Sequence, residues 1–281
     1  MESELYKKIY QIVMKVYTKT TLKRIKYTDT DIALTYLWAV LHDRPTSWAC
    51  NKKNWPIYFR RKPLPDASTI CRRLKTKGVQ QLLRDVEKHT RGINDRSLCR
   101  WIDGKALRIS NVSTDSDAGY GYATGGKGMG YRLHAIADIR QGFVAWKVLP
   151  MQCNESKIAA SLISAVEDGG YLIGDNAYEK NHLYELAGQK SIKLFAPKRQ
   201  AASLGHKRHS PHRLEALPRL ESSFVKGLIK GRVGIERMFG QLTNFSCGLK
   251  PLPNWVRTLR RVEMWVRAKI IFFHVWRTEN I

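Results

Sequence analysis

The segment YLIGDNAYE, residues 171–179, is the part of the sequence that is most informative about the fold. The apolar run at its start lies between two glycines, and an apolar run of this length between turn residues is typical of a buried strand. Asp175 follows at the carboxyl end of the strand, where open α/β sheets place their ligands. Alternatively, Asp175 only caps the helix expected from Tyr178 to Ala187. The choice between these two roles depends on the other acidic residues of the chain.

Charge is the dominant feature of the composition. The chain has 281 residues, with 49 Lys and Arg against 24 Asp and Glu, which gives a formal net charge of +25. Hydrophobic residues make up 43%, enough for an ordinary core. A charge so far from zero indicates a polyanionic partner. Because the basic residues are spread along the whole chain, nucleic acid is favoured over an anionic membrane, which a single basic amphipathic helix would bind.

The cysteines and the N-terminus indicate the compartment. The five cysteines are far apart and form no CxxC pair, which argues against a zinc ribbon and for a reducing environment. The start, MESELYKKIYQIVMKVY, has no long apolar region of the kind found in secretory signals. The longest apolar run, residues 32–41, is too short to span a bilayer. We therefore expect a cytoplasmic protein.

Residues 1–95 have a helical pattern and are expected to form a DNA-binding region. One helix should be capped by Asp29 or Thr30, and another should run from Asp66 until Gly78 ends it. The second helix could be the recognition helix of a helix-turn-helix, with base contacts from residues 67–77, or a solvated basic face. Its candidate DNA-binding cations are Arg72, Arg73 and Lys75. A linker is expected at residues 92–97, because GINDRS is polar and contains a glycine.

From residue 98 the pattern changes to strands alternating with helices. LCRWIDGKAL predicts a strand that ends at Asp103 to Lys105, and YRLHAIADI and GFVAWKVLP predict an antiparallel pair. A helix at residues 153–168 and a strand at 192–196 complete a mixed α/β sheet. Residues 111–130 are expected to form a long glycine-rich loop. Its GYATGGKG resembles a P-loop, but a glycine replaces the Ser or Thr that would bind magnesium, so we reject that function.

The C-terminal third is expected to contain a basic loop and two helices. The loop, residues 198–213, carries three histidines, and we prefer a DNA-facing role for it over zinc binding. The helices are predicted at residues 224–245 and 255–276, the second amphipathic with an apolar stripe in the core. Its outer face would carry Arg257, Arg260, Arg261 and Arg267. The candidate DNA-binding cations of this region are Lys198, Arg199, Lys207, Arg208, Arg232 and Arg237.

Three carboxylates could converge at one edge of this sheet. If the strands before Asp103 and Asp175 are parallel neighbours, both side chains come to the same edge. Glu236 lies in a later helix, where Ile235 and Phe239 can pack inward and leave Glu236 facing the aspartates. Three such acids repel one another unless cations compensate, and magnesium prefers oxygen ligands of this kind. Two metals in such a site can activate a water or a 3′-hydroxyl and stabilise the leaving oxygen.

At these residues the sequence resembles the DDE transposases of bacterial insertion sequences. The matching segments are WIDGKAL, YRLHAIADIRQGFVAWKVLP with NES after it, IGDNAYE, RVGIERMFGQL and, nearer the N-terminus, LPDASTICRRL. One branch of the family has a Tyr three residues before the Arg and a Lys seven after the Glu. This chain has Ile229 and Thr243 at those positions. It is therefore closer to the branch with the pattern RxxxERxF, and whether second-strand cleavage uses a hairpin is left open by the resemblance.

The resemblance implies a ribonuclease-H-like α/β fold with a mixed sheet flanked by helices and preceded by a mostly helical N-terminal domain. Residues 1–95 would bind DNA, and residues 96–281 would form the catalytic domain with a basic insertion near residues 197–225. Asp103, Asp175 and Glu236 would be the catalytic and metal-binding triad, with Mg²⁺ as the cofactor and Mn²⁺ as a substitute. Arg232 would contact DNA or orient the acid.

The implied function is a DNA transposase of the bacterial nucleoid. It would bind the ends of its element as double-stranded DNA, cleave the backbone with divalent metal and transfer the 3′-OH ends to target DNA. Cutting two ends together implies a homodimer on DNA. Two alternatives stay open: a non-catalytic DNA-binding protein derived from a transposase, and a related metal-dependent DNA nuclease.

Overall fold

The computed structural model divides the chain into two compact units, each treated by itself. It describes residues 2–17, 26–59, 63–91, 97–110, 113–123, 125–198 and 209–280. The helical unit contains Met1–Gly92, Leu242–Val256 and Arg261–Ile281, and the sheet unit contains Ile93–Gln241 and Arg257–Arg260. The helical unit thus takes segments from both ends of the chain, whereas the sequence pattern predicts a division near residue 95. The linker expected at 92–97 falls almost entirely outside the described residues.

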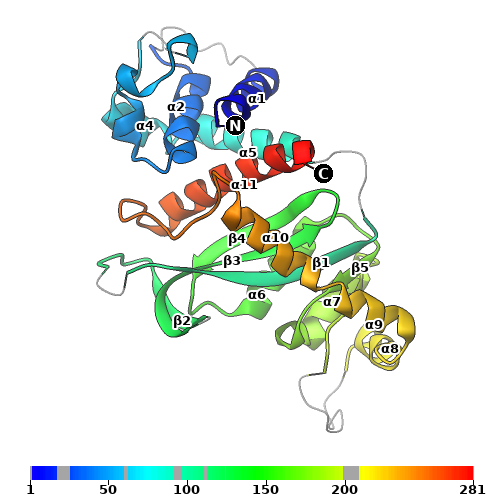
Figure 1. Cartoon of the computed structure of the whole chain (residues 1–281). Helices are drawn as coiled ribbons and strands as arrows, with labels where there is room; N and C mark the ends of the chain where they lie inside the picture. Colours follow the sequence, from blue (N-terminus) through cyan, green and yellow to red (C-terminus); the bar gives the residue numbers. More distant parts are fainter. Residues whose placement is uncertain are drawn as a thin grey trace. The chain divides into compact units, whose positions relative to one another are not determined.

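The helical unit confirms the helical pattern of the N-terminal region (Figure 1). Its core is aromatic: the ring of Trp38 lies 4.7 Å from that of Tyr6 and 4.9 Å from that of Trp55. Eleven residues of the second helix are buried, so it packs on all sides. The N-terminal helices of this unit are α1 (Glu2–Val16), α2 (Asp29–Leu41), α3 (Thr46–Ala49), α4 (Ala67–Arg73) and α5 (Lys77–Thr90), with the 3₁₀ turns η1 (Lys52–Asn54) and η2 (Ile57–Phe59).

Two helix boundaries in this unit differ from the sequence analysis. Helix α2 is capped by Thr28, not by Asp29 or Thr30, because a capping box with Asp31 satisfies the first backbone amides. Helix α4 ends at Arg73, and Gly78 lies in the first turn of α5 and does not end a helix. The segment of residues 67–77 therefore contains a helix of seven residues followed by a turn, and its use as a recognition helix remains a proposal.

The C-terminal helix α11 (Leu259–Asn280) also differs from the amphipathic helix expected at residues 255–276. Trp255 precedes the helix and is 43% exposed, although the apolar stripe does lie in the core. Lys269 is fully buried, and its Nζ lies 2.6 Å from Asp43 Oδ1 and 3.0 Å from the carbonyl of Cys247. Arg267 forms an ion pair with buried Glu87 and is not part of an outer cationic face. Because paired charges are buried among its apolar residues, this helix is packed on several sides.

The sheet unit has the topology of a ribonuclease-H-like fold. Strand β1 pairs antiparallel with β3 and parallel with β5, and β5 pairs parallel with β6. The far edge of β3 pairs antiparallel with β2 and β4. This mixed sheet confirms the expected fold class (Figure 1). Its strands are β1 (Cys99–Arg108), β2 (Gly119–Ala123), β3 (Gly126–Asp138), β4 (Gly142–Pro150), β5 (Tyr171–Ile173) and β6 (Lys193–Phe195).

The prediction of a long loop at residues 111–130 is wrong. Residues 119–130 form the β2–β3 hairpin, in which Tyr120 pairs with Met129 and Tyr122 with Lys127. Its many glycines lower the strand propensity of the sequence, which is why the pattern resembles a loop. Rejection of the P-loop is consistent with the structure, because the stretch that resembles one lies within this hairpin and does not open a helix.

Helices cover both faces of the sheet (Figure 1). Arg132 on β3 forms an ion pair with Glu155 of α6, and Trp101 on β1 lies under Gly234 of α10, so these helices are on opposite faces. The single helix predicted at residues 224–245 is interrupted at 231–232, and the helix expected at 178 begins only at 181, after a 3₁₀ turn. The helical elements after β4 are α6 (Glu155–Ala165), η3 (Asn176–Tyr178), α7 (Asn181–Gln189), α8 (Pro211–Arg219), α9 (Ser223–Lys230) and α10 (Val233–Asn244).

Candidate active site

The two aspartates occupy matching positions on neighbouring parallel strands. The last pair between β1 and β5 joins Trp101 to Ile173. Asp103 and Asp175 each lie two residues beyond this pair, so both reach the same edge of the β1–β5 pair. Strand β1 itself continues to Arg108, and the prediction that it ends at Asp103 to Lys105 is wrong. The strand continues because residues 103–108 still pair with β3 after β5 has ended.

Asp103 is a crowded carboxylate. Its side chain is 21% exposed, its Oδ1 accepts a hydrogen bond from the amide of Gly104 at 2.8 Å, and its Oδ2 lies 3.5 Å from Nη1 of Arg232. Burial raises the pKa of Asp103, and the negative charges of Asp175 and Glu236 raise it further. The Gly104 hydrogen bond and the Arg232 guanidinium act in the opposite direction. Such a cluster favours the binding of additional positive charge.

Asp175 does cap the turn that follows it. Its Oδ1 accepts a hydrogen bond from the amide of Ala177 at 2.8 Å, at the start of η3. This bond uses one carboxylate oxygen, so capping and ligand binding are compatible in the same side chain. Two glycines allow the close packing at the ends of this strand. Gly170 has φ +82°, and a Cβ there would lie 2.5 Å from the carbonyl of Leu98. A Cβ at Gly174 would lie 2.8 Å from the ring of Tyr178.

Glu236 is held in the first turn of α10 by packing on both sides of it. Ile235 and Phe239 are buried, as expected, and the ring of Phe239 stacks on Phe143 at 5.4 Å. Gly234 lets the helix approach β1, because a Cβ at this position would lie 3.3 Å from the indole of Trp101. The importance of Gly234 was missed in the sequence, where this glycine only weakens the expected helix.

Arg232 lies between the first and third carboxylates. Its Nη2 is 2.8 Å from Oε1 of Glu236, and its Nη1 is 3.5 Å from Oδ2 of Asp103. Glu236 is 52% exposed, while Arg232 is 29% exposed. The structure thus brings Asp103, Arg232 and Glu236 together by ion pairs. Asp175 lies after β5 at the position that corresponds to Asp103 on the neighbouring strand β1.

A divalent cation fits this site by the chemistry of its donors, since carboxylate oxygens are the ligands that magnesium prefers. Within the described ranges, however, no three His, Cys, Asp or Glu side chains are close enough together to hold a metal. Arg232 engages Oε1 of Glu236, so a cation shared by the three carboxylates would compete with this guanidinium for the charge of Glu236. Of the three histidines considered for zinc, His206 lies outside the described residues, and His209 Nδ1 is 2.6 Å from Nη1 of Arg213.

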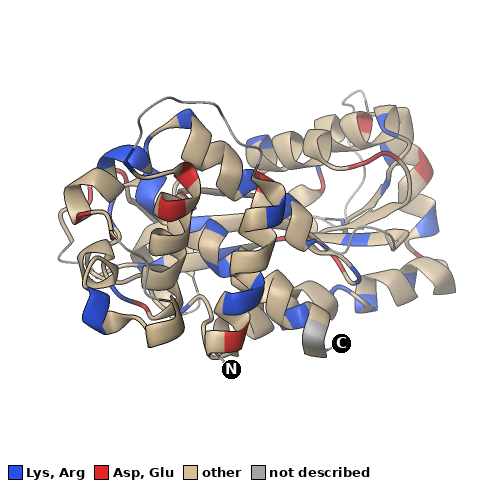
Figure 2. Cartoon of the chain, turned by 90° about the horizontal axis from the view of Figure 1, so that it is seen from above, with Lys and Arg blue, Asp and Glu red and all other residues tan. Residues whose placement is uncertain are grey.

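The candidate DNA-binding cations have different environments. Arg73 is engaged by Asp29 at 2.5 Å and by the carbonyl of Tyr27 at 3.1 Å. Arg72 is exposed, with Nη2 3.4 Å from the hydroxyl of Thr69. Lys and Arg recur on the helices of both units, with fewer Asp and Glu between them (Figure 2). Lys75, Lys198 and Arg237 are exposed, and Arg199, Lys207 and Arg208 lie outside the described residues.

Arg213, at the end of the expected basic loop, has a structural partner. It lies in α8, and its Nε and Nη2 are 2.6 Å and 2.5 Å from Oε1 of Glu179, the last residue of YLIGDNAYE. Only 7% of the Glu179 side chain is exposed. This ion pair joins α8 to the segment that carries Asp175, a role that the sequence alone did not reveal.

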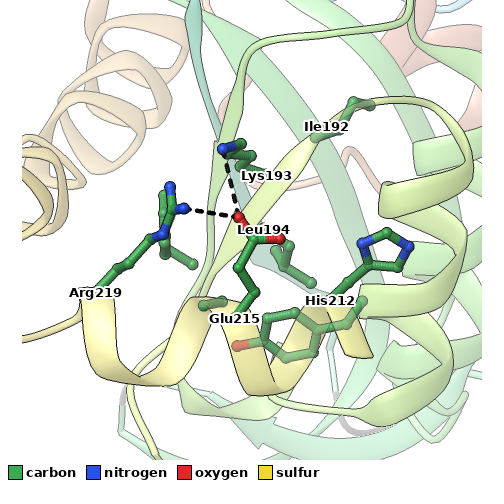
Figure 3. Close-up of a pocket in the computed structure, with 9 residues that line it drawn as sticks. Ile192, Lys193, Leu194, His212, Glu215 and Arg219 are labelled. Atoms are coloured by element: carbon green, nitrogen blue, oxygen red, sulfur yellow. Dashed lines mark ion pairs between the residues drawn. The ribbon is translucent and has the colours of Figure 1, made fainter. Parts of the chain in front are cut away.

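A small pocket lies beside the last strand of the sheet and is lined by none of the three carboxylates (Figure 3). At its mouth Glu215 lies 2.9 Å from Arg219 and 3.6 Å from Lys193. These charged side chains are about half exposed, so their ion pairs contribute little. The carboxylate cluster is therefore the better candidate for an active site.

In the described part of the chain, no helix is long and apolar enough to cross a membrane.

The sheet unit is a mixed sheet with the two aspartates in matching register on neighbouring strands and the glutamate on a covering helix. The family model described as "Transposase DDE domain" matches residues 95–271, more than half of the chain. The chain therefore belongs to the DDE transposase family.

Two solved structures are similar at low sequence identity. The piggyBac transposase synaptic complex with hairpin DNA shares 10% identity over 99% of this chain and 74% of that chain, with a TM-score of 0.43. An intasome of simian T-cell lymphotropic virus in complex with PP2A regulatory subunit B56 gamma shares 12% identity over 71% of this chain and 58% of that chain, with a TM-score of 0.27. No curated protein sequence matches the chain.

Proposed function

We propose that the protein is a DNA transposase of a bacterial insertion sequence. It would bind the ends of its element, cleave the phosphodiester backbone and transfer the 3′-OH ends to target DNA. The observation that carries this proposal is the carboxylate cluster: Asp103 and Asp175 in matching register, with Glu236 joined to Asp103 through Arg232. Family membership supports the class of reaction, and the net charge of +25 supports DNA as the substrate.

The three carboxylates would hold Mg²⁺ or Mn²⁺. When bound, such a cation neutralises the clustered charge and stabilises the oxygens around the phosphorus. Asp103 and Asp175 would provide oxygen ligands from the sheet edge, and Glu236 would join them after leaving Arg232. The backbone amides of Gly104 and Ala177 would keep both aspartates oriented through the hydrogen bonds they already donate.

Arg232 would then be available to the DNA. A guanidinium released by Glu236 can form a bidentate contact with a phosphate next to the reacting group. Further phosphate contacts would come from Arg237 and Lys198, and also from Arg199, Lys207 and Arg208. Contacts of this kind give affinity and salt dependence but no sequence preference.

Recognition of the element ends needs base contacts, for which the region around α4 is the candidate. Arg72 and Lys75 are exposed there and could reach a groove, whereas Arg73 would first have to leave Asp29. Cutting two ends together would require at least a homodimer on DNA. A protein with these activities would be found on the bacterial nucleoid.

A strand-transfer assay separates this proposal from its two alternatives. The protein would be incubated with a DNA fragment that contains the element end and its flanking DNA, a supercoiled target plasmid and Mg²⁺ or Mn²⁺. A covalent joint between fragment and plasmid is the expected product. Cleavage without joining would instead indicate a nuclease, and salt-sensitive binding without either reaction would indicate a non-catalytic DNA-binding protein.

A further inference from the structure

The β2–β3 hairpin presents an exposed aromatic face. Tyr120 and Tyr122 alternate along β2, so both side chains lie on the same face, and they are 55% and 75% exposed. Their partners on β3, Met129 and Lys127, share this face. We call these four residues the tyrosine face. Two aromatic rings exposed side by side on one face offer flat apolar surfaces on which a planar group can stack.

On its opposite face the hairpin packs closely against other residues at three glycines. A Cβ at Gly121 would lie 2.8 Å from Cβ of Met151, and a Cβ at Gly119 would overlap the side chain of Gln152. On β3, a Cβ at Gly128 would lie 2.5 Å from Nη2 of Arg108. Because side chains are missing on this face, the hairpin can press directly against the residues beneath it.

Two arginines fix the backbone of the hairpin from its base. Arg132 Nη2 donates to the carbonyl of Tyr122 at 2.5 Å, and Arg132 is itself held by an ion pair with Glu155. Arg108 Nη2 donates to the carbonyl of Lys127 at 3.0 Å. These contacts hold the hairpin backbone in one conformation, so less backbone entropy is lost when the tyrosines bind a partner.

The tyrosine face belongs to the same side of the sheet as the carboxylates. Asp103 pairs with Ala135 and Tyr122 pairs with Lys127. Ala135 and Lys127 are separated by an even number of residues on β3, so their side chains, and those of their partners, lie on the same face of the sheet. Eight residues separate these two positions on β3, which is at most about 26 Å at 3.3 Å per residue. Between them the face is covered, because Tyr131 is buried and donates to Asp115 at 2.8 Å. The two exposed ends are thus the carboxylate cluster and the tyrosine face.

Charge distinguishes between possible partners of the tyrosine face. Residues 118–137 contain no Asp or Glu, while Lys127 is exposed on this face. An acidic partner is therefore favoured over a neutral protein surface. Exposed aromatic rings beside a cation are the usual means by which proteins bind single-stranded nucleic acid, with bases stacked on the rings and the backbone near the cation.

We infer that the β2–β3 hairpin binds DNA by stacking Tyr120 and Tyr122 on unpaired bases, with Lys127 beside a phosphate. The bases have to be unpaired, because the faces of paired bases are already covered by their neighbours in the duplex. This inference rests on the proposed function, since the bound strand would be the one whose backbone runs to Asp103. It adds a second DNA contact on the same side of the sheet as the carboxylates, eight residues along β3 from the partner of Asp103.

Fluorescence anisotropy with a labelled single-stranded oligonucleotide, in metal-free buffer, tests this inference. The double variant Tyr120→Ala/Tyr122→Ala should bind about 30-fold more weakly than the wild type or weaker still, because each of the two stacked bases depends on one ring. Tyr120→Phe/Tyr122→Phe keeps both rings and should stay within about twofold. Ile139→Ala, a change at a 52% exposed apolar residue in the β3–β4 turn, is the matched control and should have no effect.

Lys127→Gln provides a second measurement. If Lys127 lies beside a phosphate, the slope of log K against log salt for the single strand should fall by about 0.7. Unchanged binding by the double alanine variant would overturn the inference, and so would a loss confined to duplex DNA. Weaker binding by the phenylalanine pair equal to that of the alanine pair would also overturn it, because stacking does not need the hydroxyls.

The assay also separates this inference from the proposed function. No metal is present and no bond is cleaved, so a protein that fails in strand transfer can still show the loss caused by the tyrosine substitutions. In that case the proposed function fails and the hairpin contact stands. If strand transfer succeeds and the alanine pair binds normally, only the hairpin contact fails.

Discussion

Replacing Arg213 by methionine tests whether this residue serves the fold or the DNA. In the structure its guanidinium contacts Oε1 of Glu179 through Nε at 2.6 Å and Nη2 at 2.5 Å. The Arg213 side chain is 14% exposed and that of Glu179 is 7% exposed. Arg213→Met would keep most of the apolar stem but leave a buried carboxylate without its cation. Removing one partner of a buried pair typically costs about 3–5 kcal/mol.

Part of the lost stability should be recovered when the carboxylate of Glu179 is also removed. We expect Arg213→Met to lower the free energy of unfolding by about 3 kcal/mol or more. The double variant Glu179→Gln/Arg213→Met should be more stable than Arg213→Met alone, because no unpaired charge is then buried. The two single variants and the double variant form a double-mutant cycle, which isolates the coupling between the two side chains.

Urea unfolding followed by tryptophan fluorescence measures each stability, and anisotropy with duplex DNA measures binding. Glu215→Gln in the same helix, a change at a 50% exposed carboxylate, is the matched control and should shift stability by less than about 1 kcal/mol. The reasoning is refuted if Arg213→Met unfolds like the wild type while its DNA affinity and salt slope fall. That result would assign Arg213 to the DNA, as a basic loop at residues 198–213 implies.

Three further predictions concern the carboxylate site and the pH dependence of folding. Arg232→Gln should tighten Mn²⁺ binding in the absence of DNA by up to about fivefold, because a partly exposed ion pair such as that of Arg232 with Glu236 contributes about 0.2–1 kcal/mol. Electron paramagnetic resonance measures this affinity, and an unchanged value would contradict the proposed competition between Arg232 and the metal for Glu236. Gly234→Val should destabilise the sheet unit by about 1–3 kcal/mol through overlap with Trp101, and Gly234→Ala should cost less; equal urea midpoints for both would contradict the close packing. Burial lowers the pKa of His274 to about 3, so the folded state keeps this imidazole neutral while the unfolded state binds a proton below about pH 6.5. Stability should therefore fall between about pH 6.5 and 3, and His274→Gln should make urea midpoints less dependent on pH in this window.

The sequence was sufficient to predict the strand at residues 171–173 and the position of Asp175 at its end. A short apolar run between glycines has few other conformations, and a buried parallel neighbour is expected in a mixed sheet. The pairing of β5 with β1 brings Asp103 to the same edge, as the sequence analysis required. These features are local, or follow from the order of the elements.

The β2–β3 hairpin could not be predicted, because its conformation depends on residues far along the chain. Glycines that indicate a loop by propensity are required here by the closeness of Met151 and Gln152. The same holds for Arg213, whose partner Glu179 is 34 residues away. A basic residue in a basic segment gives no local sign of a buried ion pair.

Helix α11 illustrates the same limit in the core. Val262, Val266, Ile270 and Phe273 are buried as predicted, but Trp255 is exposed, and the burial of Lys269 was not predicted. Asp43, which is 226 residues away, makes that burial possible. Sequence periodicity shows which residues can be apolar together, but not which charges are paired across the fold.

The most direct test of the central claim is metal-dependent cleavage of DNA that contains the element ends. Wild type would be compared with Asp103→Asn, Asp175→Asn and Glu236→Gln, each first shown to bind the same DNA as wild type does. We predict cleavage at the ends by wild type with Mg²⁺ or Mn²⁺, and its loss in all three variants. Cleavage by Asp175→Asn at the wild-type rate would contradict the account, because Asp175 would then only cap the turn that follows it.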